Sequence, residues 1–360
     1  DHRGPAFEAL TGELLAALAP VFNCHGPIII FPSSGTGAWE AALVNTCAPG
    51  DRVLMAETGH FATQWLRLAE RLGLVVDFLP GDWRSPADPD AIAARLADDR
   101  EHAIRAVAVV HNETSTGVVS DVAAVRRAID AADHPALLLV DTISSLASLP
   151  YDHDGWGVDV TVGASQKGLM LPPGLGFNAV GERALDAALT RAGVARGYWD
   201  WQPIIEANRQ GRFPYTPATN LLFGLREALA MLAEEGLDEV FARHARHAAA
   251  TGAAVAAWGL ETVCRDPAYA SASLTAVMLP EGHDADAFRE GVERRYAMAL
   301  GNGLGRFAGR VFRIGHLGDF DDLMLAATLS GVELGLDAAA VPRAGSGVAA
   351  ALAVLGGRSA

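Results

Sequence analysis

Short apolar runs that alternate with helical patterns constrain this fold more than any other feature of the sequence. Runs of strand length occur at 52–57, 74–79, 105–110, 136–140 and 158–162. Between them apolar residues recur at helical spacing, as over 61–72 and again after Ser120, which we expect to cap a helix. Continuous Val- and Leu-rich strands joined by helices are typical of a largely parallel sheet covered on both faces. Ligands of such sheets bind beyond the carboxyl ends of the strands.

The pattern changes near residue 237. The later elements that we expect are a long helix at 237–258, a strand at 273–279, a helix at 284–296, a strand at 310–314 and a helix from 321. We therefore predict an α/β protein with a large domain over 1–236 and a smaller α+β domain over 237–360. The Gly/Ala-rich end, 344–360, forms either a last helix or a poorly ordered tail.

The balance of charges disfavours some classes of partner. The chain has 43 acidic against 28 basic residues and a net charge of −15, which argues against binding to nucleic acid or to an anionic membrane. No apolar stretch approaches the roughly 20 residues of a membrane span, and the start, Asp1-His2-Arg3, lacks a signal-type region, so we expect a cytoplasmic protein. The three cysteines are scattered and predict neither disulfides nor a CxxC metal site.

One lysine, Lys167, stands against 27 arginines. An Arg-rich coding bias would leave a single lysine by chance. Alternatively, this position requires a primary amine that can lose its proton and attack a carbonyl group, which arginine cannot do. The count alone does not decide between these explanations.

Two polar segments follow predicted strands in the first part of the chain. At 33–37 a Gly/Ser/Thr turn opens a helix, which makes either an anion site for a phosphate or an ordinary capped helix. At 111–117 six polar residues end in glycine, which indicates either a ligand-binding loop or a turn whose polar groups satisfy one another.

Two further segments place charged groups at strand ends. Asp141 ends an apolar strand, where it is either desolvated or paired with a positive partner. Lys167 follows the 158–162 strand among small residues, where poor solvation would favour its neutral, nucleophilic form. A phosphate cradle, a buried carboxylate and an isolated amine on one sheet edge together match pyridoxal phosphate.

These motifs resemble those of the class V aminotransferases of fold type I, and within them the serine–glyoxylate and alanine–glyoxylate group. The resemblance runs over nearly the whole chain and rests on the following segments in order: Ser34-Gly35-Thr36, 111–117, 140–145, Ser165-Gln166-Lys167 with Pro172-Pro173-Gly174, and 312–316.

The resemblance implies a role for each matching residue. Lys167 corresponds to the Schiff-base lysine that also shuttles the substrate proton, and Asp141 to the partner of the pyridinium nitrogen. Arg313 corresponds to the arginine that clamps the substrate carboxylate. The further cofactor contacts implied are Ser34, Gly35, Thr36 and Gln166 at the phosphate, Phe61 over the ring, Ile143 under it, and the hydroxyl of Thr114. Thr216 lies on a loop that would reach the cofactor from the second subunit, so the resemblance also implies a homodimer with shared sites.

The implied activity is transfer of the amino group of serine, alanine or aspartate to glyoxylate, giving glycine by a ping-pong mechanism. Two departures are visible: no Pro-Gly-Pro segment precedes Asp1, and the end, Gly-Arg-Ser-Ala, shows no peroxisomal address. Three other interpretations remain: another fold type I enzyme, such as a phosphonate-directed transaminase or a cysteine desulfurase, a non-enzymatic α/β binding protein, and a metal enzyme. The last would use His244 and His247, which more simply belong to a solvated helical face.

Overall fold

The fold is built around a seven-stranded sheet in the order β1-β9-β8-β7-β4-β2-β3. The computed structural model describes residues 1–190 and 194–357. The strands of this sheet are β1 (Ile28–Ser33), β2 (Arg52–Ala56), β3 (Val75–Leu79), β4 (Ile104–Val110), β7 (Leu137–Asp141), β8 (Val160–Ala164) and β9 (Gly174–Val180). The five strands from β8 to β3 are parallel, whereas β9 runs antiparallel to both β1 and β8. The predicted, largely parallel sheet is therefore confirmed.

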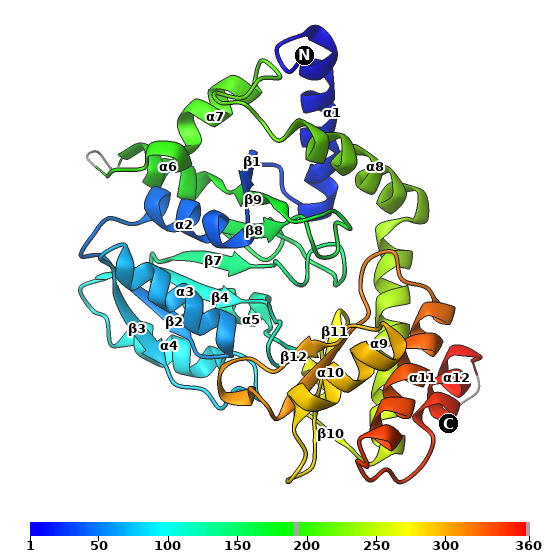
Figure 1. The fold of residues 1–360 in the computed structure, drawn as a ribbon. Coiled ribbons are helices and arrows are strands. Elements are labelled where there is room, and N and C mark those ends of the chain that lie inside the picture. Colours follow the sequence, from blue (N-terminus) through cyan, green and yellow to red (C-terminus); the bar gives the residue numbers. More distant parts are fainter. Residues whose placement is uncertain (191–193, 358–360) are drawn as a thin grey trace.

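Helices cover both faces of this sheet (Figure 1). One face packs against α2 (Gly35–Thr46), α3 (His60–Arg71), α6 (Glu182–Thr190) and α7 (Trp201–Asn208). The other packs against α1 (Pro5–Phe22), α4 (Pro89–Ala97), α5 (Val122–Ala131) and α8 (Thr219–Glu235). In β7, Leu137 and Leu139 enter the first layer while Leu138 and Val140 enter the second. This alternation explains why the strand is apolar at every position.

Helix α1 qualifies the expectation that no stretch could span a membrane. Its 18 residues, Pro5–Phe22, are long and apolar enough by length and composition alone, and 39% of them are buried. A core helix passes the same test. Leu10, Leu14, Leu18 and Phe22 belong to the cluster that packs under β1, β9 and α8, and this packing accounts for much of the apolar character of the helix.

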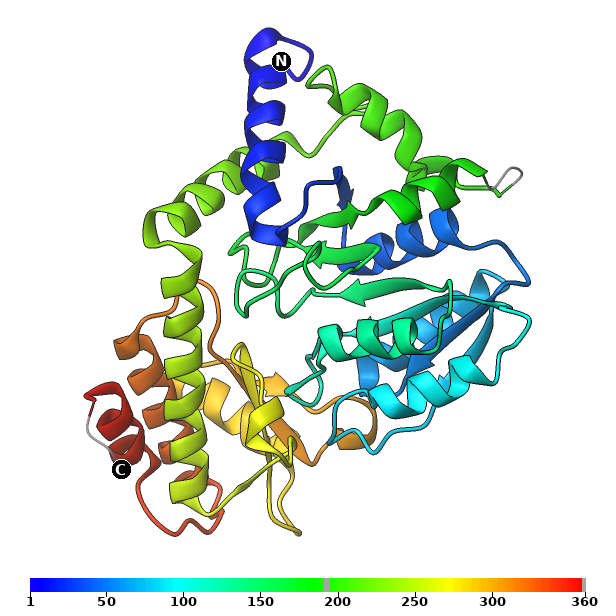
Figure 2. The ribbon, with the colours of Figure 1, turned by 180° about the vertical axis from the view of Figure 1, so that it is seen from behind.

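The C-terminal part forms a second layer of helices on a small antiparallel sheet in the order β10-β11-β13-β12 (Figure 2). Its strands are β10 (Glu261–Thr262), β11 (Leu274–Met278), β12 (Gly301–Asn302) and β13 (Val311–Gly315). Its helices are α9 (Leu237–Trp258), α10 (Ala285–Tyr296), α11 (Asp322–Ala338) and α12 (Gly347–Leu355). Gly236, with φ of 85°, separates α8 from α9 at the predicted domain boundary, which itself stays a prediction. Helix α12 lies within the Gly/Ala-rich end, and residues 358–360 lie outside the described residues.

One predicted cap is wrong. Helix α5 begins after Asp121, whose carboxylate accepts a hydrogen bond from the backbone nitrogen of Ala124 at 2.8 Å. The Ser120 hydroxyl instead accepts from the backbone nitrogen of Ala87 at 3.1 Å. Both residue types cap helices well, so their order in the sequence could not decide which one does so.

Candidate active site

Three loops meet at the carboxyl ends of β4, β7 and β8. Backbone bonds join them directly: His111 donates to the carbonyl of Asp141 at 2.9 Å, and Thr142 donates to that of Val162 at 2.8 Å. The 111–117 segment forms a hairpin from β5 (Asn112–Glu113) and β6 (Val118–Val119). The sheet thus brings the polar segments after β4, β7 and β8 to one edge, as parallel topology requires.

Asp141 is a buried carboxylate at this edge, with 4% of its surface exposed. One oxygen accepts from the backbone nitrogen of Ile143 at 2.7 Å and the other from the indole nitrogen of Trp39 at 3.0 Å. Burial outweighs these two bonds and raises the pKa of Asp141 to about 7. The sequence left open whether Asp141 is desolvated or paired with a positive partner. The structure shows that it is desolvated, and that Lys167 is a nearby positive group without a hydrogen bond to it.

Trp39 was not predicted as a site residue. It lies on α2 four residues after Gly35, so both share one face of the helix, and that spacing is the signal that could have identified it. Its indole ring stacks on that of Trp65 with centroids 5.7 Å apart and planes 12° apart. The stacked pair fixes the indole nitrogen toward Asp141.

Lys167 lies in the loop that leaves β8. Burial lowers the pKa of the Lys167 amine, and the nearby positive charge of Arg313 lowers it further, whereas Asp141 acts in the opposite direction without cancelling the shift. Among residues 1–190 and 194–357, its amine makes no hydrogen bond. The loop is held by Ser165, whose hydroxyl donates to the carbonyl of Pro172 at 2.9 Å. The result is an amine on a fixed loop, poorly solvated and inclined to its neutral form.

The start of α2 offers free donors beside Ile143. Ser34 precedes the helix but its side chain makes no capping bond, and within the described chain the backbone nitrogens of Gly35 and Thr36 have no partner. A Cβ on Gly35 would stand 2.3 Å from the Cδ1 atom of Ile143, so a larger residue would require the Ile143 side chain to move. Uncapped N–H groups at the positive end of a helix suit an anion such as a phosphate.

Gln166 and Thr216 differ in their relation to this anion site at the start of α2. The amide oxygen of Gln166 is buried and has no partner within the described ranges, which is unusual for a buried polar atom. Thr216 is exposed on the segment between α7 and α8, and no hydrogen bond joins it to the other predicted residues. Its neighbour Tyr215 donates from its hydroxyl to the carbonyl of Ile30 at 3.1 Å.

Glu113, which the sequence analysis did not select, positions Phe61. Its fully buried carboxylate accepts from the backbone nitrogens of Phe61 and Ala62, each at 3.1 Å, at the start of α3. It also accepts from the hydroxyl of Ser115 at 2.7 Å. A carboxylate at this position caps the start of α3, and its negative charge interacts favourably with the positive end of the helix dipole. Phe61, half-buried, thereby lies edge-on to Trp39 with ring centroids 6.4 Å apart.

Thr114 and Arg313 join the two parts of the molecule. Arg313, on β13, donates from Nη1 to the carbonyl of Thr114 at 2.9 Å and from Nε to the carbonyl of Asn302 at 2.8 Å. Its Nη2 has no bond to any described residue, so part of the guanidinium stays available. The Thr114 hydroxyl contacts that of Ser144 at 2.5 Å. The polar groups of the 111–117 loop therefore do satisfy one another in part, while they also line the site.

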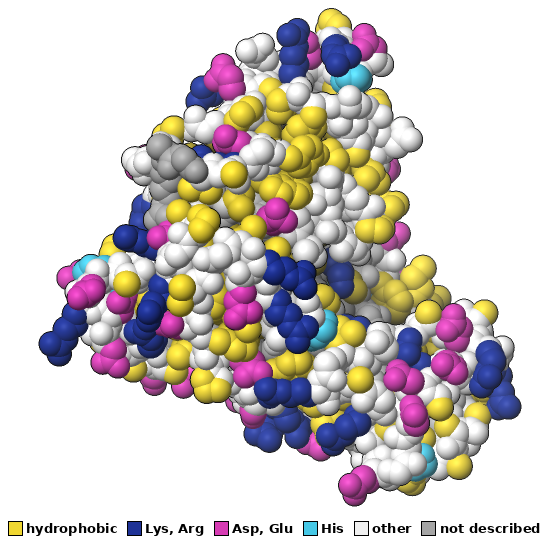
Figure 3. Space-filling model, turned by 60° about the vertical axis from the view of Figure 1, so that its left-hand side comes forward, with side chains coloured by type: hydrophobic (Ala, Val, Ile, Leu, Met, Phe, Trp, Pro, Cys, Tyr) yellow, Lys and Arg dark blue, Asp and Glu magenta, His cyan; other side chains and the backbone are white. Residues whose placement is uncertain are grey.

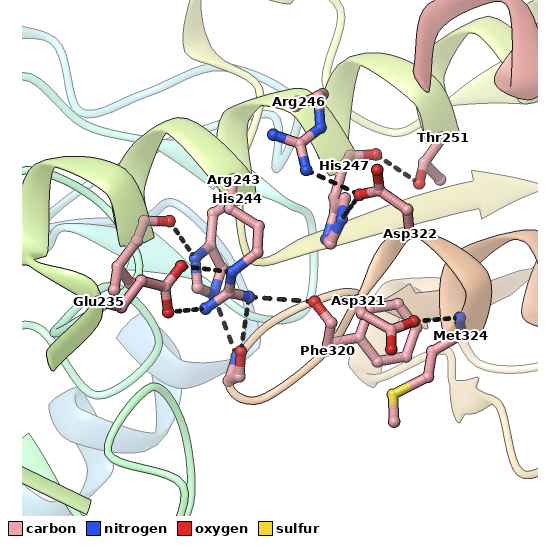
Figure 4. A network of polar contacts seen from close by, with 12 residues as sticks. Glu235, Arg243, His244, Arg246, His247, Thr251, Phe320, Asp321, Asp322 and Met324 are labelled. Atoms are coloured by element: carbon pink, nitrogen blue, oxygen red, sulfur yellow. Dashed lines mark hydrogen bonds and ion pairs between the residues drawn. The ribbon is translucent and has the colours of Figure 1, made fainter. Parts of the chain in front are cut away.

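His244 and His247 are buried, so the expectation of a solvated helical face is wrong. Both rings are fully buried in the network of Figure 4. The Nε2 atom of His244 accepts from the backbone nitrogen of Gly318 at 3.0 Å, and that of His247 contacts the Asp322 carboxylate at 2.8 Å. With Arg243, which donates to the carbonyl of Gly318 at 2.8 Å, they tie α9 to the loop that follows β13. That loop passes close to the backbone of Lys167.

Comparisons with known proteins agree with this geometry. The chain is 50% identical to the serine–glyoxylate aminotransferase of Methylorubrum extorquens, over 99% of this chain and 90% of that protein. It is 43% identical to the L-aspartate–glyoxylate aminotransferase of Paracoccus denitrificans, over 98% and 89%. The alanine–glyoxylate aminotransferase structure from Nostoc sp. superposes with a TM-score of 0.88 at 31% identity, covering 93% and 88%. Residues 6–303 match the family Aminotransferase class-V. The chain belongs to the class-V aminotransferases, and its fold is that of fold type I.

Proposed function

We propose that this aminotransferase uses pyridoxal phosphate to move the amino group of a small L-amino acid to glyoxylate, giving glycine. The single observation that carries the proposal is the meeting of Asp141, Lys167 and the uncapped start of α2 at one sheet edge. Serine is our first choice of donor because the relative that shares half of the residues is named for it. Aspartate and alanine follow from the other two relatives.

Three features of the chain fit this cofactor. The free N–H groups at the start of α2 provide donors for a phosphate. Ile143 and Phe61 supply apolar contacts for a flat ring. Asp141 is a buried carboxylate whose burial is uncompensated by any bonded cation among the described residues, which suits a protonated ring nitrogen.

The chain's own residues then divide the work. When bound, pyridoxal phosphate supplies a carbonyl carbon for amines and a ring that accepts the electrons left by removal of the substrate's α-proton. The Lys167 amine, whose pKa is lowered by burial, takes up that proton and returns it. The free edge of the Arg313 guanidinium holds the substrate carboxylate.

Basic side chains gather locally on the surface despite the net charge of −15. Figure 3 shows basic side chains gathered at the edge of a hollow between the large body and the lobe at the lower right. Local positive charge at a concave site raises the concentration of anions there. Amino acids and glyoxylate both bring a carboxylate.

We propose in addition that the enzyme is a homodimer whose subunits share active sites through the segment around Thr216. Exposure of Thr216 and of Tyr198, which stacks on Tyr215 with centroids 4.7 Å apart, supports this. So does a groove with apolar walls between α1, α6 and α7, which includes Leu15, Ile28 and Leu189. Light scattering of the protein as it elutes from a size-exclusion column would give twice the chain mass for a dimer. A measured mass of 37.6 kDa, that of one chain, would exclude the dimer.

The test of cofactor and lysine is reduction with borohydride followed by peptide mapping. We expect a visible absorbance band that disappears on reduction, leaving a pyridoxyl group on Lys167. Because Lys167 is the one lysine in the sequence, it is the one side chain on which this adduct can form. A protein that stays colourless with added pyridoxal phosphate contradicts the cofactor. A coloured protein that transfers no amino group from serine, alanine or aspartate to glyoxylate contradicts the substrates alone.

Among the competing interpretations, the cysteine desulfurase loses support. A cysteine desulfurase needs a reactive thiol near the cofactor, yet Cys24, Cys47 and Cys264 are all buried and none belongs to the loops around Lys167. Burial raises the pKa of Cys24 to about 11 and that of Cys264 above its usual range, which makes both poor nucleophiles.

A further inference from the structure

A cluster of metal-binding groups lies where α1 ends, before the first residue of β8. The Cys24 thiol, the His153 ring and the Asp154 carboxylate each offer a ligand atom, and these atoms lie within 4.8 Å of one another. Cys24 lies between α1 and β1, and His153 and Asp154 lie in the loop that precedes β8, whereas Lys167 follows that strand. The site is thus separate from the proposed catalytic groups.

His153 carries the strongest sign that something is bound here. The residue has no exposed surface, and its Nε2 atom has no hydrogen-bond partner in the described structure. Its other nitrogen, Nδ1, contacts the Thr161 hydroxyl at 2.7 Å, and that hydroxyl also contacts the hydroxyl of Tyr151. This arrangement fixes the ring so that Nε2 faces Cys24 and Asp154. Metal-binding histidines are typically oriented in this way through their second nitrogen.

The backbone already holds the two segments in register. His153 donates from its backbone nitrogen to the carbonyl of Phe22, and Asp154 donates to that of Asn23, both at 3.2 Å. The backbone nitrogen of His25 donates to the Asp154 carboxylate at 2.9 Å. These bonds place the two segments that carry the ligands side by side.

Access and ligand chemistry narrow the choice of ion. The side chains of His25 and Asp154 are exposed, so an ion can reach the cluster from solvent. A thiolate, an imidazole and a carboxylate are the ligands of zinc, at about 2.0–2.3 Å. Atoms within 4.8 Å of one another close on such an ion with small movements of the exposed Asp154 side chain.

We propose that Cys24, His153 and Asp154 form a zinc-type site that fastens the end of α1 to the loop before β8. His25, which contacts the Asp154 carboxylate through Nδ1, orients that carboxylate. No spacing in the sequence indicated this site, because its ligands come from segments more than one hundred residues apart and form no CxxC motif.

Cobalt titration of the cofactor-loaded enzyme tests this proposal. After removal of metal by a chelator, we expect one Co²⁺ per chain, with bands in the red visible region, where pyridoxal phosphate does not absorb, and displacement by Zn²⁺. Cys24→Ser abolishes the bands, and Asp154→Asn, an exposed change that does not threaten folding, weakens binding at least about tenfold. Cys264→Ser, a matched change of another buried thiol, leaves the titration unaltered. Absence of the bands in the wild type, or the same bands in Cys24→Ser, overturns the proposal.

Discussion

The indole nitrogen of Trp39 donates a hydrogen bond to the carboxylate of Asp141 across 3.0 Å. This bond connects α2, whose start provides the anion cradle, to the end of β7. The geometry of the cradle and that of the carboxylate are therefore set by the same helix.

Replacing Trp39 by Phe keeps a ring against Trp65 and removes the donor. A hydrogen bond to a charged group contributes about 1.5–3 kcal/mol, so we expect pyridoxal phosphate to bind about 10- to 100-fold more weakly. Equilibrium titration of the cofactor-free protein measures this. Trp65→Phe, which alters the stack but not the bond, is the control, and equal losses in both variants would contradict the role of the bond.

The pKa of Asp141, about 7, predicts a distinctive pH dependence. A folded-state pKa above the ordinary 3.8 stabilises the cofactor-free protein at low pH, and this contribution is lost as pH rises toward 7. Between about pH 4 and pH 7, wild type should lose about 1.4 kcal/mol of unfolding free energy per pH unit relative to Asp141→Asn. Denaturant unfolding at several pH values measures the difference, and parallel curves for the two proteins would disprove it.

Arg313→Lys tests the carboxylate clamp. Lysine keeps the charge but loses the planar fork, along with the bonds to Thr114 and Asn302. We expect KM for both amino donor and glyoxylate to rise about 10- to 100-fold while the cofactor stays bound. Arg310→Lys, an exposed change next to the same strand, should have no effect. Unchanged KM values in Arg313→Lys would remove the residue from the substrate site.

Gly35→Ala tests the close approach of α2 to Ile143. The new methyl group would stand 2.3 Å from the Cδ1 atom of Ile143, so one of them must move. Overpacking of this kind costs about 1–3 kcal/mol of stability, and we expect weaker cofactor binding with it. Gly12→Ala on α1, where a methyl group meets nothing within 4 Å, should instead stabilise the protein by about 0.5–1 kcal/mol. Thermal unfolding compares the two.

Glu113→Gln tests the positioning of Phe61. The amide has one acceptor oxygen in place of two and must leave some of the N–H groups of Phe61, Ala62 and Ser115 unpaired. We expect a loss of about 1.5–3 kcal/mol in stability and a shifted absorbance band of the bound cofactor. Glu70→Gln, on the exposed side of the same helix, is the control. An unshifted band with reduced stability would limit Glu113 to a structural role.

The sequence was sufficient to predict those features of the site that depend on strand ends and on local spacing. Asp141 and Lys167 each follow a run of apolar residues, so their place at one sheet edge follows from parallel topology. What could not be predicted depends on pairing between distant segments. Trp39 reaches Asp141 across 102 residues, and His244 is buried because the loop at Gly318 folds back on it across 74. Helical periodicity reports the face of a helix but not which segment will cover it.

The order of the strands has a consequence for synthesis of the chain. β1 has one neighbour in its sheet, β9, and Ile28 pairs with Ala179. During synthesis β1 must therefore remain without this partner until the chain has been made as far as β9. Helix α1, which precedes it, packs against α8, which is translated later still. Pairing of such distant segments slows folding, and we expect the N-terminal 33 residues to be the part of the nascent chain that most needs protection from aggregation.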